Sequence, residues 1–191
     1  LAAGVQAVAT AYRRSVVISG MVIRRDAAMA VSTQRFDGTL LYQLYLVGMI
    51  LADRAVVFVP DIIALRRDGT PPDFGNSASE KGLFTPRDQT PASSVHFMKG
   101  MLAIARHVGQ ATGLNVFPLI RSDIGNYSYP ILSIQASRPL GVFLSYCRDL
   151  AKLGLWRYPL FHIYFMALLV LGPMRSDALI NAIKKRIGHT P

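Results

Sequence analysis

The chain has 191 residues, of which 51% are hydrophobic and 17% are charged, so it is long and apolar enough to bury a core and is not a disordered chain. Its one cysteine, Cys147, excludes an internal disulfide framework and a thiolate metal cluster. The formal net charge is +10, and residues 121–191 hold nine Arg or Lys against three Asp, beside a long apolar run. This combination favours an anionic lipid surface as partner, where each Lys or Arg near the headgroups is worth roughly 1 kcal/mol.

The N-terminal part predicts the end of a helix followed by two strands. The opening letters "LAAGVQAVATAYRR" are typical of the back half of a helix, as expected for a piece of a longer protein. Two apolar, largely β-branched runs follow at residues 16–18 and 21–23 and meet at Ser19-Gly20, where glycine lets the backbone twist. Asp26 is expected to cap the turn that comes next.

A helix, a third strand and a long loop are predicted after that. Apolar residues recur at helical spacing in residues 38–54, and Thr39 is placed to cap that helix. Residues 55–67 resemble a strand that Pro60 divides or places at a sheet edge. Residues 68–91 contain four prolines and three glycines, which predicts a loop. The loop is either a mobile lid or a plain connector.

The remaining sequence is predominantly helical. Thr90 and Pro91 form an N-cap and a first helical position, and Gly113 is suited to end that helix. Residues 113–132 are interpreted as irregular because they are rich in aromatic residues, glycine and proline. The next helix begins at Ser137 or Pro139 and ends at Gly154.

The C-terminal end predicts one more helix, which begins after a stop at Gly172-Pro173. Ser176 is expected to cap it, and its last turn carries three basic residues that interact favourably with the helix dipole. The predicted fold is therefore an α/β fragment that is mostly helical, with a few strands near the N-terminus. We divide it into residues 1–67, a loop or lid at 68–91, and a helical region at 92–191.

Residues 153–173, "LGLWRYPLFHIYFMALLVLGP", have three possible placements: across a membrane, along its surface, or inside a soluble core. The uninterrupted apolar part, residues 160–172, is shorter than the roughly 20 residues that a spanning helix needs. Tryptophan, tyrosine and arginine at its start suit the headgroup region, so the surface placement is favoured. The side chains expected to contact the membrane are Trp156, Arg157, Phe161, Phe165, Lys184, Lys185 and Arg186.

Several other site types lack their sequence signals. The four histidines are dispersed, without a carboxylate at ligand spacing, and no motif for a P-loop, a dinucleotide fingerprint or a nucleophile elbow occurs. No basic run is longer than residues 184–186, and aromatic residues do not alternate with basic ones, so a nucleic-acid partner is not expected.

Three stretches, "VVISGMVIRRD", "FDGTLLYQLYLVGMIL" and "VVFVPDIIALRRDG", together resemble the acceptor-side half of the family 2 glycosyltransferases of bacteria. The segments "GLFTPRDQTPASSVHFMKGML" and "DIGNYSYPILSIQASRPLGVFLSY" are similar to the tail of these enzymes, so the resemblance covers most of the chain. It implies a GT-A-like fold and an inverting transfer of sugar from a nucleotide-sugar donor to a lipid-linked or polysaccharide acceptor.

The same resemblance implies roles for particular residues. Relatives often carry adjacent acids at the start of the acceptor helix, where this chain has Tyr42-Gln43. The nearest carboxylate is that of Asp37, which is therefore the candidate catalytic base. The residues expected to bind substrate are Ser19, Gly20, Arg24, Arg25, Tyr42 and Gln43. A divalent cation, Mn²⁺ or Mg²⁺, would be bound by an Asp-x-Asp motif that lies before this region in the family and does not occur here.

The resemblance also implies a location, at the cytoplasmic face of the inner membrane as a peripheral or monotopic protein. The main alternative is a non-catalytic, basic, helical module or scaffold that lies on the membrane surface and recruits a partner. A soluble helical regulator is a third class, and it would require the apolar helix at residues 155–172 to be buried.

Overall fold

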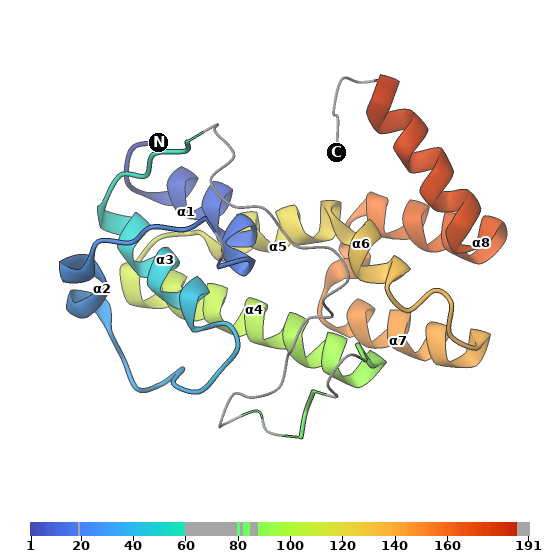
Figure 1. The fold of residues 1–191 in the computed structure, drawn as a ribbon, viewed down its shortest axis with the longest axis horizontal. Helices are drawn as coiled ribbons and strands as arrows, with labels where there is room; N and C mark the ends of the chain where they lie inside the picture. The colour runs from blue at the N-terminus through green and yellow to red at the C-terminus, as the bar shows by residue number, and fades with distance from the viewer. Residues whose placement is uncertain (19, 60–79, 81, 85–87, 187–191) are drawn as a thin grey trace. The chain divides into compact units, whose positions relative to one another are not determined.

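A computed structural model of the chain describes residues 1–18, 20–59, 80, 82–84 and 88–186 (Figure 1). These residues are mostly helical, as the sequence predicts, and they form two compact units, residues 1–123 and 124–191. The predicted division at residues 67 and 91 stays a prediction. Most of the predicted lid lies outside the described residues.

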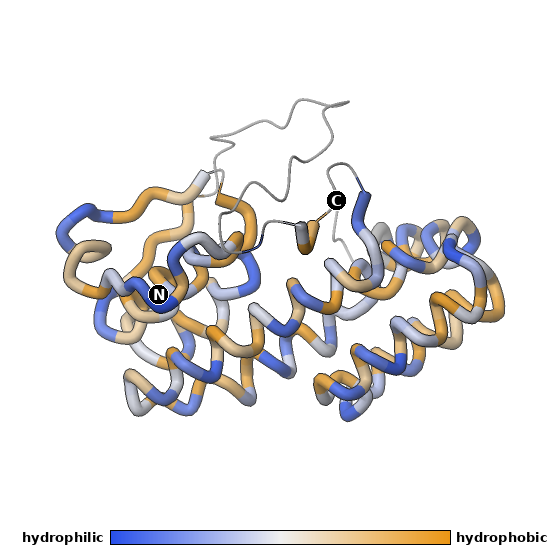
Figure 2. Tube along the Cα trace, turned by 90° about the horizontal axis from the view of Figure 1, so that it is seen from below, coloured by the Kyte–Doolittle hydropathy of each residue, from blue (hydrophilic) through white to orange (hydrophobic). Residues whose placement is uncertain are grey.

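The elements of the two units are as follows. Unit 1 contains α1 (Val5–Tyr12), the 3-10 helix η1 (Arg13–Val16), α2 (Arg25–Val31), α3 (Tyr42–Asp53), α4 (Pro91–Thr112) and the first part of α5 (Phe117–Asn126). Unit 2 contains the end of α5, α6 (Ser128–Ser133), α7 (Leu140–Lys152), the 3-10 helix η3 (Leu155–Arg157) and α8 (Pro159–Arg186). Figure 2 shows apolar and polar residues interleaved along the helices, as expected where each helix buries one face.

The core of unit 1 lies between α1, α3 and α4. The buried Tyr12 hydroxyl donates a 2.7 Å hydrogen bond to the carbonyl of Met101, which ties α1 to α4, and burial raises the pKa of this phenol. A Cβ on Gly48 of α3 would lie 2.7 Å from a methyl carbon of Val108, so these two helices pack with no room for a larger residue. An ion pair between Arg13 and Asp123, at 2.6 Å, holds α5 against the end of α1.

The limits of α4 are the ones that the sequence predicts. Thr90 accepts a hydrogen bond from the backbone N–H of Ser93, Pro91 takes the first helical position, and Gly113 ends the helix with a positive φ of 69°. The predicted cap of α3 is wrong, because Thr39 donates its hydroxyl to the carbonyl of Phe36 and Leu41 takes the N-cap position instead.

The predicted N-terminal strands are not shown in the described part of the chain. Val16 belongs to η1, whereas residues 17–18, 21–24 and 55–59 have no regular secondary structure. Gly20 does turn the backbone as expected: its φ is 84°, and the N–H of Met21 donates to the carbonyl of Ile18. Among the residues that the structure describes, these β-branched side chains are therefore not part of a sheet.

Residues 117–126 and 128–132 are helical rather than irregular, which corrects the sequence interpretation of this stretch, whereas residues 113–116 are not helical. Pro118 and Pro130 lie in the first turns of α5 and α6, where the missing N–H costs no intrahelical hydrogen bond. Gly125 lies inside α5 for a packing reason, because a Cβ there would be 2.1 Å from Cδ2 of Tyr158. The opening helix is also shorter than predicted, since α1 begins after Gly4, whose φ of 112° is not helical.

Aromatic contacts hold unit 2 together. Tyr129 of α6 meets Tyr164 of α8 edge to face and donates its hydroxyl to Asp177, at 2.5 Å, further along the same helix. Burial, helped by Asp177, raises the pKa of the Tyr129 phenol. Phe143 of α7 stacks on Phe165 of α8. Cys147 is buried in α7, and burial raises the pKa of its thiol to about 12, so it is a packing residue rather than a nucleophile.

The packing of Gly125 against Tyr158 gives a test of unit 2. Gly125→Ala places a methyl group inside the Tyr158 ring, so it should lower the free energy of unfolding by about 1–3 kcal/mol. Gly141→Ala in α7 is the matched control: its Cβ meets nothing within 4 Å, and it should leave stability equal or slightly higher. Urea unfolding followed by circular dichroism measures both. Equal stabilities of the two variants would show that the α5–Tyr158 contact is wrong.

Candidate functional site

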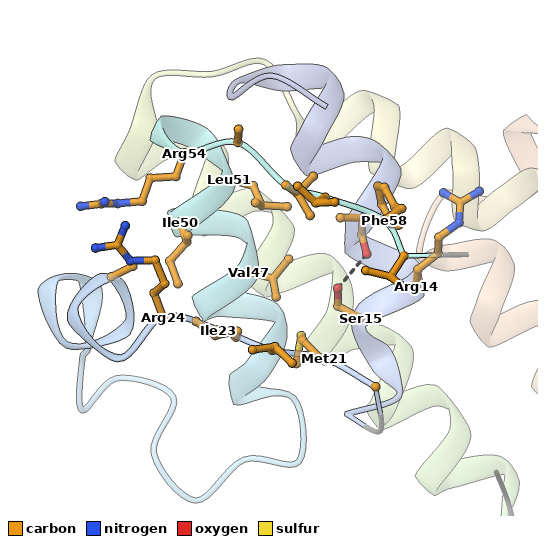
Figure 3. A pocket seen from close by; sticks show the side chains of 18 of the residues that line it. Arg14, Ser15, Met21, Ile23, Arg24, Val47, Ile50, Leu51, Arg54 and Phe58 are labelled. Atoms are coloured by element: carbon orange, nitrogen blue, oxygen red, sulfur yellow. Dashed lines mark hydrogen bonds between the residues drawn. The ribbon is translucent and has the colours of Figure 1, made fainter. Parts of the chain in front are cut away.

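The described part of unit 1 contains a groove of about 840 Å³. We call "the groove" the space lined by α3, by residues 20–24 and by residues 54–59, together with Arg14 and Ser15. Figure 3 shows the two non-helical segments on opposite sides, with Val47, Ile50 and Leu51 of α3 between them. The floor is therefore apolar.

Three arginines stand at the rim of the groove. Arg24 and Arg54 lie beside one another at one end, and Arg14 lies at the other (Figure 3). Arg24 makes two hydrogen bonds to Asp26, at 3.0 and 2.6 Å. These bonds, with the more distant charge of Arg54, hold the pKa of Asp26 below its usual range. Arg14 donates to the carbonyl of Thr10. No carboxylate lines the groove among the described residues.

The structure brings together only part of the predicted substrate-binding set. Gly20 and Arg24 line the groove. Arg25 opens α2, is exposed and does not line it. Ser19 lies outside the described residues. The predicted cap at Asp26 is wrong: Arg24 takes the N-cap position of α2, and Asp26 lies in the first turn of the helix and is paired with Arg24.

The predicted base and its neighbours lie elsewhere. Asp37 is exposed in the turn before α3, where its N–H donates to the carbonyl of Gln34. The Tyr42 hydroxyl is bound to the backbone of Thr33, and the Gln43 amide donates to the carbonyl of Val16. These two side chains hold the backbone in place, and none of the three predicted residues lines the groove.

The described residues do not form a metal centre. No group of three His, Cys, Asp or Glu side chains is placed to hold an ion in the part of the chain that the structure describes. The divalent cation implied by the sequence resemblance would be bound by an Asp-x-Asp motif that precedes this region in the family, so this finding does not bear on it.

The second candidate surface is the apolar helix α8. Residues Pro159–Ile183 are long and apolar enough to cross a membrane, by length and composition alone. Only 11% of the most apolar 18 residues are buried, whereas the central helix of a soluble core would bury most of that surface. Burial of this helix in a soluble core, which the third alternative, a soluble regulator, requires, is not what the described residues show.

A break divides α8 into two arms. Gly172 has φ 73° and ψ 169°, a conformation that is almost restricted to glycine, and Pro173 follows it. Figure 1 shows the second arm turning sharply away from the first. The Ser176 hydroxyl donates to the carbonyl of Ala167, at 3.0 Å, so it links the two arms instead of capping a separate helix as predicted. Each arm is roughly 20 Å long.

The predicted membrane-contacting residues divide into two groups. Trp156 is exposed, with the guanidinium of Arg157 against its ring, and Arg186 is exposed at the far end. Phe161 is only 4% exposed and faces the core of unit 2, which corrects its assignment as a lipid contact. Phe165 is half-buried against Phe143. The side chains of residues 184 and 185 lie outside the described part.

The most exposed apolar side chains of α8 lie beside its break, which sequence reasoning missed. Val170 is 71% exposed and Met174 is 85% exposed. The sequence signal was available: Gly172-Pro173 marks a corner, and a corner exposes the residues on both sides of it. We name residues 170–174 the α8 tip.

Removing both helix-breaking residues tests the break. The double variant Gly172→Ala, Pro173→Ala should let α8 run straight. Spin labels on cysteines replacing the exposed Ile163 and Leu179, with Cys147→Ala, would then lie about 24 Å apart along the axis, and closer in the parent protein. Labels at Ile163 and Val170, on one arm, are the control and should not move. An unchanged distance between positions 163 and 179 would contradict the break.

Comparison of the chain with models of known protein families, with curated proteins and with solved structures finds no match. Its function is therefore inferred from the groove, the α8 surface and the sequence itself.

Proposed function

We propose that this chain is the acceptor-side part of an inverting glycosyltransferase that works at a membrane surface. It would transfer sugar from a nucleotide-sugar donor to a lipid-linked or polysaccharide acceptor. The observation that carries the membrane part is the uncovered apolar surface of α8. The sugar-transfer part rests on the resemblance of residues 16–69 and of the later segments to family 2 enzymes, with a GT-A-like fold and a few strands near the N-terminus.

The geometry of α8 favours a monotopic attachment over a complete span. Neither arm of roughly 20 Å crosses a hydrocarbon core of about 30 Å. A bent helix instead buries its tip in one leaflet and keeps both ends at the same face. Trp156 and Arg157 at one end and Arg186 at the other suit the headgroup layer of an anionic membrane.

The proposed chemistry uses Asp37 as the general base. Its carboxylate takes the proton of the acceptor hydroxyl, whose oxygen attacks the anomeric carbon of the donor while the bond to the nucleoside diphosphate breaks and that group leaves with the electron pair. Arg24, at the rim of the groove, would neutralise a phosphate charge by exchanging its partner Asp26 for the phosphate. The exposed turn that holds Asp37 leaves its carboxylate accessible to a sugar hydroxyl.

A second candidate function is a non-catalytic, basic membrane-surface module. It is favoured by one specific observation: Asp37, Tyr42 and Gln43 lie outside the groove, and the last two are used to hold the backbone. The two functions share the membrane surface of α8 and differ in whether Asp37 has a chemical role.

Vesicle flotation tests the membrane attachment. The chain should float with vesicles of mixed zwitterionic and anionic lipid and less with purely zwitterionic ones. Met174→Asp, at the α8 tip, should lower partitioning by about tenfold or more, because a large apolar side chain no longer enters the leaflet.

Met29→Asp is the matched control, since Met29 is an exposed methionine on α2 in the other unit, and it should float like the parent. Equal flotation of the two variants, or no preference for anionic lipid, would contradict attachment through the α8 tip.

Donor turnover separates the two functions. The protein expressed from its full natural reading frame should release nucleoside diphosphate from one member of a panel of nucleotide sugars. Asp37→Asn should reduce transfer at least about 100-fold. Asp53→Asn, an exposed acid at the end of α3, should leave transfer unchanged. Transfer that survives Asp37→Asn would reject Asp37 as base, and no turnover with any donor would favour the non-catalytic module.

A further inference from the structure

The two segments that flank the groove expose large apolar side chains. Val22 is 92% exposed on one side and Val57 is 82% exposed on the other, and the lining residues Val17, Phe58 and Val59 are also exposed. Isolated apolar side chains on a surface are ordinary, but a continuous patch that lines a hollow usually marks a binding surface.

The segment at residues 54–59 already pairs as a strand at one point. The amino group of Leu1 donates to the carbonyl of Val56, at 2.7 Å, and the N–H of Val56 donates to the carbonyl of Leu1, at 3.0 Å. This reciprocal exchange is the hydrogen-bonded pair of an antiparallel ladder. In an extended segment the backbone groups of alternate residues point to opposite edges, so those of residues 55, 57 and 59 lie on the edge away from Leu1. Among the described residues, no backbone hydrogen bond occupies that edge, and a strand is able to pair there.

The residue types of both segments fit a sheet rather than a loop. Residues 55–59 read Ala-Val-Val-Phe-Val, and residues 21–23 read Met-Val-Ile, which are strongly β-forming. Arg54 adopts an extended backbone, with φ −125° and ψ 147°, and Val17 likewise, with φ −90° and ψ 117°. The sequence of both segments thus favours strands, and the extended Arg54 leads into residues 55–59 in a conformation compatible with pairing, although no strand is formed among the described residues.

The rim of the groove indicates the charge of that partner. Arg14 stands at one end and Arg54 at the other, beside Arg24, whose charge is balanced by Asp26, and no carboxylate lines the groove among the described residues. An occupant with acidic groups near its two ends would complement this rim.

We propose that the groove is a docking site for an extended polypeptide strand that pairs with residues 54–59, has apolar side chains at alternate positions and carries acidic residues near both ends. Backbone hydrogen bonds would supply most of the affinity, as in β-strand addition generally, and the exposed valines would supply the side-chain contacts. The inference does not depend on sugar transfer, because the non-catalytic module would use the groove in the same way.

Amide hydrogen exchange of the 191-residue chain tests the proposal. The probe is a synthetic peptide of alternating valine and threonine with aspartate at each end, compared with the same peptide carrying N-methyl groups on alternate amides. The unmethylated peptide should slow exchange in residues 57–59 by about tenfold or more, and the methylated peptide should not, because it lacks donors for the ladder.

Two exposed positions provide matched variants. Val57→Lys should abolish the protection, and Met29→Lys, on α2 outside the groove lining, should keep it. Circular dichroism checks that both variants remain folded. The strand assignment would be overturned if the peptide gave no protection at millimolar concentration, or if the methylated peptide protected equally well. Equal protection by dodecyl phosphate, an anionic apolar chain without backbone amides, would overturn it too. Neither Met174→Asp nor Asp37→Asn should change the result, so failure here is distinct from failure of the proposed function.

Discussion

The apolar surface of α8 has to be covered, and the break at Gly172-Pro173 limits how this is done. A straight helix of this length would cross a bilayer, but two arms of roughly 20 Å do not. The contacts inside unit 2 do not cover this surface. Tyr129 and Phe143 pack against the inner face of α8, and the outer face and the α8 tip stay exposed. A lipid leaflet satisfies both constraints if the α8 tip enters it and the basic ends of α8 stay at its surface.

Unit 1 has a comparable requirement, of a different chemical kind. Its uncovered groups are β-branched side chains and backbone edges, which lipid satisfies poorly because backbone N–H and C=O groups need hydrogen-bond partners. A strand provides such partners, and the single reciprocal pair between Leu1 and Val56 shows that this backbone is able to accept one. We therefore propose different partners for the two uncovered surfaces, a membrane for α8 and a polypeptide for the groove.

The sequence predicted features with a local physical cause. The N-cap at Thr90 and the break at Gly172-Pro173 depend on neighbouring residues alone, so they could be predicted. Gly125 could not, because the glycine there makes room for a ring 33 positions away in the chain (Tyr158), and a sequence pattern shows only that glycine weakens a helix. The candidate site was predicted only in part. Gly20 and Arg24 belong to one short segment, so the sequence could place them together in the groove lining. The position of Asp37 outside the groove depends on tertiary packing, which the sequence pattern does not show.

The sole tryptophan of the chain, Trp156, reports directly on the central claim that unit 2 rests on one leaflet through α8. Quenching of its fluorescence by brominated lipids measures its depth in the bilayer. The account predicts strong quenching by bromine placed near the headgroups of anionic vesicles and weak quenching by bromine near the bilayer centre. Absence of quenching at every bromine position, with Trp156 as accessible to aqueous iodide as it is without vesicles, would contradict it.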